Sequence, residues 1–389
     1  MPTGKGGRMH FEFTERQAEI RDRARAFLDT HCDTARMQEL ARSDVFPADL
    51  WEALASSGLL KVALPKAVGG DEAGLTGAAI VSEVLARASS TLVNMYLVNT
   101  VFAGGLIMIA GSDEQRVRIL PALAQGQCRL AFALTEPGAG SDAASVATSA
   151  RRDGDHWILD GEKRYTTGAR DADYVLVVTR TEPQAKASQA ISVFLVPTDA
   201  EGFGISPMEK ITDNAYASCD LKLDSVRVGP EALLGGEDGL NRAWSALRIT
   251  GGMERVCVAA SSLGLCKAVL ADAAAHARER EQFGQPIGQF QAIQHLLAEM
   301  ATSIEALQWL TYAGAWKADR GEDAGKEISM AKSFAAETVN RLVLEGLRIL
   351  GGEGFLAATP MARYQREALL SLYAGGTIEI QKNLIARYL

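Results

Sequence analysis

The sequence predicts an α+β protein of several units: an N-terminal α-helical domain, a central β-barrel or sandwich domain, and a C-terminal helical bundle. Three observations predict this order. Helical periodicity fills the first third, short β-rich runs follow Cys128, and long helical runs return after Gly239. A chain of 389 residues is also too long for one core, so two or three packed units are expected. We place the domains at residues 1–125, 126–237 and 238–389.

Helix start signals support the first domain. Thr14 and Gln17 have the spacing of a capping box, in which each side chain satisfies an unpaired backbone N–H at the helix start. Ile20, Ala24 and Phe27 then recur at helical spacing. Further helices are expected at 47–58, 76–88, 91–110 and 113–124.

Turn signals separate the β-rich runs of the central third. Asp153-Gly154 and Asp160-Gly161 are both typical of hairpin turns. Regular short strands joined by hairpins indicate a small barrel or sandwich. The strands are expected at 129–134, 156–159, 174–179, 191–196 and 220–228.

The last third contains three long helical runs, at residues 240–278, 289–319 and 326–350. At about 1.5 Å per residue, each is long enough to cross a whole domain. Long helices of this kind pack as an antiparallel bundle.

Composition indicates where the protein is located and which classes of partner it does not bind. The net charge of −8 gives no electrostatic reason to bind nucleic acid or an anionic membrane. The apolar run Leu97–Ala110 is too short to cross a bilayer, and the Gly-rich segment Met1–His10 lacks the apolar core of a secretory signal and reads as a disordered lead-in. The five cysteines form no CxxC pair, so we expect reduced thiols, a cytoplasmic location and no bound metal.

The segment Leu134–Asp142 directly follows an expected strand. Gly138 and Gly140 let the backbone approach a ligand closely, and Thr135 and Ser141 supply hydroxyl groups. Such a loop suits a pyrophosphate or a ring system. Taken alone, the segment is equally compatible with an ordinary Gly-rich turn.

Together with three other segments, Leu134–Asp142 resembles the acyl-CoA dehydrogenase family. The other segments, in the family's order and spacing, are Arg278–Ile287, Leu350–Phe355 and Gly376–Arg387. The resemblance implies a C-terminal four-helix bundle, bound FAD, and a homotetramer with the flavin at a subunit interface. It also implies an acyl-CoA substrate, a role in fatty acid or amino acid catabolism, and electron transfer to an electron-transfer flavoprotein.

The resemblance assigns residues to the flavin, and elementary chemistry supports two of them. Arg280 offers fixed fork donors to a pyrophosphate, and Tyr165 can stack on a flat ring. Without the resemblance, Arg280 is better explained as a charge on the surface of a helix, and Tyr165 is equally compatible with an ordinary aromatic residue of a strand. The flavin residues that the resemblance implies in the β domain are Phe132, Leu134, Thr135, Ser141, Tyr165 and Thr167. Those that it implies toward the FAD of a neighbouring subunit are Arg280, Phe283 and Gln291, with Arg348 and Gly352 near its ADP half and Thr377 and Glu379 near its adenosine end.

Three positions depart from the family pattern. The family usually has Trp where Tyr165 stands and Gln where Arg348 stands. It often has Asp where Gly252 stands, and that Asp helps to hold the pantetheine arm of CoA. The usual CoA contacts are therefore in doubt.

The catalytic base is the fourth departure. Many family members carry a Glu just before the C-terminal Gly-Thr pair, where this chain has Gly375, which has no side chain. In the isovaleryl and long-chain branches the base lies instead in a segment resembling Met253-Glu254-Arg255. The resemblance therefore implies Glu254 as the base and the Gly375 backbone N–H as the donor to the substrate carbonyl.

Helical periodicity supports Glu254 independently. It lies on the stripe formed by positions 244, 247, 251, 254, 258, 261 and 265, which is otherwise apolar or small. A lone carboxylate on such a face should have a raised pKa, which suits a general base, and Gly251-Gly252 leaves room for a thioester. The alternative is a structural Glu254 paired with a buried Arg. If Glu254 is not the base, Glu136 is the next carboxylate to consider.

We expect substrate contacts from Ser141, Arg255, Tyr96 and Asn99, the last two on the helix that shapes the acyl pocket in relatives. The leading hypothesis is an FAD-dependent acyl-CoA dehydrogenase. Three alternatives stay open: an enoyl-CoA reductase resembling the crotonobetainyl-CoA reductase branch, a dehydrogenase of acyl groups on a carrier protein, and a catalytically silent flavoprotein that serves as a binding partner.

Overall fold

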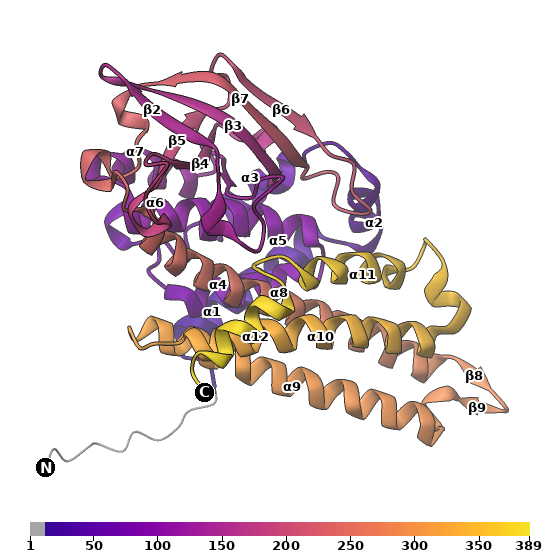
Figure 1. Ribbon diagram of the computed structural model, residues 1–389. Coiled ribbons are helices and arrows are strands. Elements are labelled where there is room, and N and C mark those ends of the chain that lie inside the picture. The colour runs from indigo at the N-terminus through magenta and orange to yellow at the C-terminus, as the bar shows by residue number, and fades with distance from the viewer. Residues whose placement is uncertain (1–11) are drawn as a thin grey trace, which may run out of the picture.

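The chain follows the predicted three-part order (Figure 1). A computed structural model describes residues 12–389, so the expectation for Met1–His10 lies outside the described residues. Figure 1 shows the helices of the first third between the β-sheet and the long C-terminal helices. The α+β architecture with helices at both ends and a central β unit is confirmed.

The first third is helical throughout. The predicted capping box is present, with Thr14 Oγ1 accepting from the Gln17 backbone N–H at 3.3 Å. From Ser90 to Ala110 the helix is continuous but widens into a π-helical segment in its middle. The elements are α1 (Glu15–His31), α2 (Thr34–Arg42), α3 (Ala48–Ser56), α4 (Gly74–Ala86), α5 (Ser90–Tyr96), the π-helix Leu97–Ala103, α6 (Gly104–Ala110) and α7 (Asp113–Ala124).

The central third forms one curved sheet with strand order β1-β4-β2-β3-β7-β6, and β5 pairs with β4. All five predicted strands are present, and two further strands, β2 and β6, were not predicted. The strands are β1 (Leu130–Ala133), β2 (Ser149–Asp153), β3 (His156–Thr167), β4 (Tyr174–Arg180), β5 (Ile191–Pro197), β6 (Phe203–Pro207) and β7 (Ser218–Val228).

One predicted turn is wrong. Asp153-Gly154 does join β2 to β3, but Asp160-Gly161 lies inside β3. The register of β3 against β7 shifts between Leu159 and Gly161, which marks a bulge. Gly161 has φ +148°, and a Cβ there would lie 2.7 Å from Thr148 Cα, so the strand passes too close to its neighbour for any side chain.

The last third is built on three long helices and two short ones. A two-stranded hairpin joins the first two long helices, and Figure 1 shows it projecting at their far end, away from the sheet. The elements are α8 (Ala243–Glu279), β8 (Glu281–Gln282), β9 (Gln285–Pro286), α9 (Gln291–Asp319), α10 (Gly325–Leu350), α11 (Pro360–Ala368) and α12 (Ile378–Ala386).

The helices of the first and last thirds share one hydrophobic core, whereas most of the β domain encloses a second, smaller one. Helix α4 packs along α8 and α9. The carboxylate of Asp319, at the end of α9, accepts from the backbone N–H groups of Leu75 and Thr76 at 2.6 and 2.9 Å and so caps α4. The β domain is therefore inserted into a helical body whose halves are far apart in sequence.

Two helices, Ser90–Ala110 and Ala243–Glu279, are apolar and long enough to span a membrane by length and composition alone. Of their most apolar windows, 78% and 72% are buried inside the protein, as expected of core helices. Within residues 12–389, no group of three His, Cys, Asp or Glu side chains is arranged to hold a metal ion.

Candidate active site

Glu254 and Gly375 meet where α8 passes the turn between α11 and α12. Glu254 is half-buried on α8. A Cβ placed on Gly375 would lie 3.7 Å from both Cγ and Oε1 of Glu254. A side chain at either position would therefore enter the same small space. The Gly375 backbone, at φ +69°, lies in the left-handed region that favours glycine.

The surroundings of Glu254 suit a group that exchanges a proton. Burial raises the pKa of its carboxyl group above the ordinary value. The positive charges of Arg255 and Lys332 and the backbone N–H of Gly375 oppose the shift without cancelling it. A carboxylate with a raised pKa accepts a proton near neutral pH more readily than an exposed one. The raised pKa expected from the apolar stripe is thus confirmed.

Polar side chains fix the turn that carries Gly375. Arg255 Nε and Gln381 Nε2 both donate to the Gly375 carbonyl at 3.1 Å. Lys332 Nζ donates to the Ser371 carbonyl at 2.7 Å. The turn is held from α8, α10 and α12 at once, so its position against Glu254 is well defined.

The two glycines one turn before Glu254 are not required by protein packing. A Cβ on Gly251 would meet only Arg255 Nη2 at 3.7 Å, and one on Gly252 only Ile328 Cδ1 at 3.9 Å. Both distances are ordinary van der Waals contacts, so alanine would fit. The open space beside α8 agrees with the expectation that these glycines leave room for a thioester.

Tyr165 is displayed by a second bulge in β3. The register against β7 shifts between Lys163 and Thr166, and Tyr165 has φ +58°, which is uncommon for a bulky residue. Its ring is 59% exposed, and the Arg164 guanidinium lies 5.1 Å from the ring centroid. Nearby, Thr167 Oγ1 lies 3.0 Å from Ser218 Oγ. The bulge therefore presents a flat aromatic surface to the outside of the sheet.

Sequence reasoning missed Tyr373, which is 62% exposed and lies near Tyr165. Burial of its hydroxyl and the proximity of Tyr165 raise its pKa. No spacing rule relates residues 165 and 373, so only the fold could show that these rings share one region.

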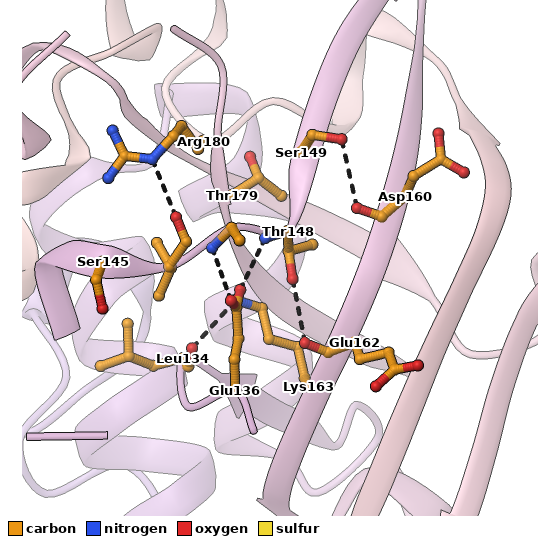
Figure 2. A network of polar contacts seen from close by, with 12 residues as sticks. Leu134, Glu136, Ser145, Thr148, Ser149, Asp160, Glu162, Lys163, Thr179 and Arg180 are labelled. Carbon is orange, nitrogen blue, oxygen red and sulfur yellow. Dashed lines mark hydrogen bonds and ion pairs between the residues drawn. The ribbon is translucent and has the colours of Figure 1, made fainter. Parts of the chain in front are cut away.

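The loop Leu134–Asp142 is pinned by a buried ion pair (Figure 2). The Glu136 carboxylate accepts from the backbone N–H groups of Ala147 and Thr148 at 2.7 and 2.9 Å and from Lys163 Nζ at 2.7 Å. Lys163 Nζ also donates to the Leu134 carbonyl at 3.1 Å. The loop is closed at its base, while Gly138 and Gly140 at its tip have no atom within 4 Å of a built Cβ.

This arrangement rules out Glu136 as a substitute base. Burial alone would raise the Glu136 pKa, but the Ala147 N–H and the Lys163 ammonium outweigh it and hold the pKa below its ordinary value. Its carboxylate oxygens already accept from the backbone N–H groups of Ala147 and Thr148 and from Lys163 Nζ. Glu136 is a structural carboxylate, and the earlier ranking of it as second candidate is wrong.

The residues expected to reach a neighbouring subunit lie on or beside the β8–β9 hairpin. Phe283, at φ +52°, and Gly284, at φ +77°, form the hairpin tip, and the Phe283 ring is 94% exposed. Arg280 and Gln291 are exposed as well. Figure 1 shows the β8–β9 hairpin at the far end of α8 and α9, away from the sheet that contains β3.

The remaining predicted flavin residues are placed as follows. Phe132, Leu134, Thr135 and Thr167 are partly buried, whereas Ser141, Gly352 and Glu379 are exposed. Arg348 forms an ion pair at 2.6 Å with Glu345 on its own helix. Thr377 caps α12 by accepting from the Ile380 N–H at 3.3 Å.

Tyr96 and Asn99 are enclosed by protein. Tyr96 is 0% and Asn99 1% exposed. The Asn99 amide donates to the Met95 carbonyl and to Tyr216 Oη, both at 2.9 Å, and accepts from the Leu130 N–H at 2.6 Å. Asn99 thus ties the π-helical segment to β1. Neither side chain presents an exposed atom here, so their contact with substrate stays a prediction.

Comparison with known proteins agrees with the fold and with the domain order. Three family descriptions match: "Acyl-CoA dehydrogenase, N-terminal domain" over residues 14–127, "middle domain" over 131–226, and "C-terminal domain" over 238–389. The chain is 36% identical over 376 residues to a 3-(aryl)acrylate reductase of Clostridium sporogenes, covering 96% of this chain and 98% of that protein. It is 33% identical to a caffeyl-CoA reductase-Etf complex subunit of Acetobacterium woodii, with the same coverage.

The structure of butyryl-CoA dehydrogenase from Megasphaera elsdenii superposes with a TM-score of 0.93, 28% identity, and coverage of 98% of this chain and 99% of that one. Fold, domain order and full-length sequence similarity therefore agree, and the chain belongs to the acyl-CoA dehydrogenase family of oxidoreductases.

Proposed function

We propose that this chain catalyses the FAD-dependent removal of hydrogen from the α and β carbons of an acyl-CoA thioester, with Glu254 taking the α proton. The observation that carries the proposal is the meeting of Glu254 and Gly375 in one small space. The base position common to many relatives has lost its side chain here, and a carboxylate with a raised pKa reaches the same place from α8.

The residues present fit FAD. Tyr165 offers an exposed ring for stacking, the tip of the Gly138–Gly140 loop offers open backbone, and α12 begins at a capped N-terminus beside Thr377. When bound, FAD supplies the acceptor for the hydride that leaves the β carbon. A solved relative titled "FAD complex of PigA" is 25% identical to this chain and superposes with a TM-score of 0.90, which supports the assignment.

The protein's own groups have three tasks in this proposal. Glu254 accepts the α proton. The Gly375 backbone N–H donates to the thioester carbonyl oxygen, which stabilises the charge that develops there as the proton leaves. The open face at Gly251 and Gly252 admits the thioester, and the anchored turn keeps base and donor at a fixed separation.

We propose that the chain forms a homotetramer in which the β8–β9 hairpin contacts a neighbouring copy. The Phe283 ring at the hairpin tip is 94% exposed, so it is free to pack against a second copy of the chain. Arg280 and Gln291 beside it would reach the FAD of a neighbouring copy. For the electrons, we propose an electron-transfer flavoprotein as the acceptor, a choice supported by the relative named as part of an Etf complex.

The second candidate function is the reverse reaction, reduction of a 2-enoyl thioester. Two of the most similar relatives are named as reductases. The same site can run in this direction, because a carboxyl group with a raised pKa can donate a proton to the α carbon as readily as it accepts one. The site residues are then unchanged, but Glu254 acts as the acid instead of the base.

Anaerobic flavin spectroscopy tests the proposal. The FAD-loaded protein is mixed with a panel of saturated acyl-CoAs, and the photoreduced protein with the matching 2-enoyl-CoAs. Bleaching by a saturated thioester supports dehydrogenation, whereas recovery of colour with enoyl-CoA alone supports the reductase. Repeating the panel with thioesters on an acyl carrier protein identifies the carrier. A protein that binds no FAD, or whose flavin responds to no thioester, overturns the proposal.

A further inference from the structure

Lys332 is a buried cation for which the proposed mechanism gives no role. Its side chain lies on the inner face of α10 and is 1% exposed. Its one hydrogen bond among residues 12–389 goes to the Ser371 carbonyl at 2.7 Å. Burial lowers its pKa to about 8, so the ammonium is still largely charged at neutral pH. A buried charge without a counter-charge is strongly unfavourable.

The charges around Lys332 identify its counter-charge. The opposite charge that acts on it most strongly is Glu254, on α8, followed by Glu379, on the first turn of α12. Arg255, on α8, repels it and is itself repelled by Arg248. Because Glu379 is exposed to solvent, Glu254 is the partner that shares the interior with Lys332.

The backbone turn connects the two groups physically. Lys332 holds one end of the segment 371–376 through the Ser371 carbonyl, and Gly375 at the other end lies against the Glu254 side chain. The α8 and α10 helices pack along each other, so this geometry is rigid. Lys332 therefore acts on the Glu254 carboxylate through its charge and on the Gly375 donor through the turn.

We propose that Lys332 is a positioning residue for the reaction: together with Arg255, its buried ammonium favours the ionised form of the Glu254 carboxylate, and it fixes the 371–376 turn against that carboxylate. This inference rests on the proposed function for its catalytic consequence. The coupling of Lys332 to Glu254 can be measured without turnover. Without this cation, only the Arg255 charge and the Gly375 N–H would oppose the effect of burial, so the Glu254 pKa would rise further above its ordinary value. A protonated carboxyl group cannot take the α proton.

Two substitutions separate the two tasks. Lys332→Gln removes the charge but keeps an N–H donor for the Ser371 carbonyl, whereas Lys332→Arg keeps the charge. Lys267→Gln is the matched control, because Lys267 lies on α8 with Glu83 at 2.7 Å and Gln308 at 2.7 Å, away from the turn.

The direct test is infrared spectroscopy of the FAD-loaded protein without substrate. The Glu254 carboxyl band is identified by its loss in Glu254→Gln and followed as the pH is lowered. In Lys332→Gln the midpoint should rise by about one pH unit or more, the scale for losing a nearby opposite charge. It should stay near the wild-type value in Lys332→Arg and in Lys267→Gln. An unchanged midpoint in Lys332→Gln overturns the proposal.

Kinetic measurements distinguish the proposed role of Lys332 from the proposed role of Glu254 as the base. If Glu254 is the base, the acid limb of the flavin-reduction rate moves by the same amount as the infrared midpoint in Lys332→Gln. If the midpoint moves and the rate profile does not, Lys332 controls Glu254 but Glu254 is not the base, so the proposed function loses its base assignment. A purely structural Lys332 would instead lower stability in both Gln and Arg variants and leave both midpoints in place.

Discussion

The β domain and the helical bundle each enclose a lysine within electrostatic reach of a glutamate, and the two pairs hold their carboxylates differently. Glu136 touches Lys163 at 2.7 Å and also accepts from two backbone N–H groups. Among residues 12–389, no side chain donates a hydrogen bond to Glu254, and the Lys332 charge acts on it without direct contact. The first pair has a lowered carboxyl pKa and the second a raised one.

The difference shows that burial alone does not decide whether the pKa of a carboxyl group is raised or lowered. Burial opposes the charged form in both places, but three hydrogen-bond donors reverse its effect at Glu136. At Glu254 the charges of Arg255 and Lys332 and the Gly375 N–H oppose the effect of burial without cancelling it, so the carboxyl pKa stays raised. The Glu136–Lys163 pair, which is in direct contact, organises a loop. The Glu254 carboxyl group, which Lys332 does not contact, stays available to react.

The largest effect is expected from breaking the Glu136–Lys163 ion pair. Lys163→Met leaves the buried Glu136 carboxylate without its cation, which should lower the free energy of unfolding by about 3–5 kcal/mol. Urea denaturation followed by circular dichroism measures it. Adding Glu136→Gln should recover part of the loss, because the amide oxygen still accepts from the backbone. If the double variant is no more stable than the single one, the pair is not an ion pair of this kind.

The next effect separates the two glutamates by function. Glu254→Gln should reduce flavin with acyl thioester at least ~100-fold more slowly, the usual scale for losing a positioned base, while FAD and thioester still bind. Stopped-flow absorbance measures the rate. Glu136→Gln should instead lower the melting temperature. A Glu254→Gln enzyme that bleaches its flavin at the wild-type rate contradicts the base assignment.

The smallest effect tests whether the two lysines are alike. Burial lowers both pKa values to about 8, against an ordinary 10.5. Between these values the folded protein has released protons that the unfolded chain retains, so each lysine makes stability rise with pH. From pH 8 to 10, the free energy of unfolding of the wild type should rise by up to about 1.4 kcal/mol per pH unit relative to that of Lys332→Met or Lys163→Met. Parallel urea curves at all pH values would contradict this.

Periodicity predicted the elements whose burial is one-sided and missed those whose burial is not. The helices α9 and α10 were predicted to within a few residues from one-sided apolar stripes. The helix α8 was predicted equally closely from its unbroken length, although its middle is buried on nearly all sides. Strand β2 was missed because Arg151, Arg152 and Asp153 face solvent, so no alternation shows. Strand β6 was missed because Gly204 and Pro207 resemble a loop. The bulges in β3 depend on close approach of neighbouring strands, which no local pattern encodes.

The candidate site was predicted unevenly for the same reason. Glu254 was found because it interrupts an apolar helical stripe. Lys332 interrupts an equally apolar stripe on α10, with Ile328, Ala335 and Val339 buried around it, so the same rule could have found it. Lys163 stands between Glu162 and Arg164, and a run of charges gives no sign of which one turns inward.

The Asp319 cap on α4 has a consequence for how the chain is made. The N-terminal half of the helical body leaves the ribosome first, but the carboxylate that completes α4 lies 243 residues after Thr76. The β domain, with its own core, can close in between. During synthesis α1 and α5 can pack on α4 early, but the α4 surface that contacts α8 and α9 lacks these partners until they are made. We expect chaperones to bind this surface in the meantime.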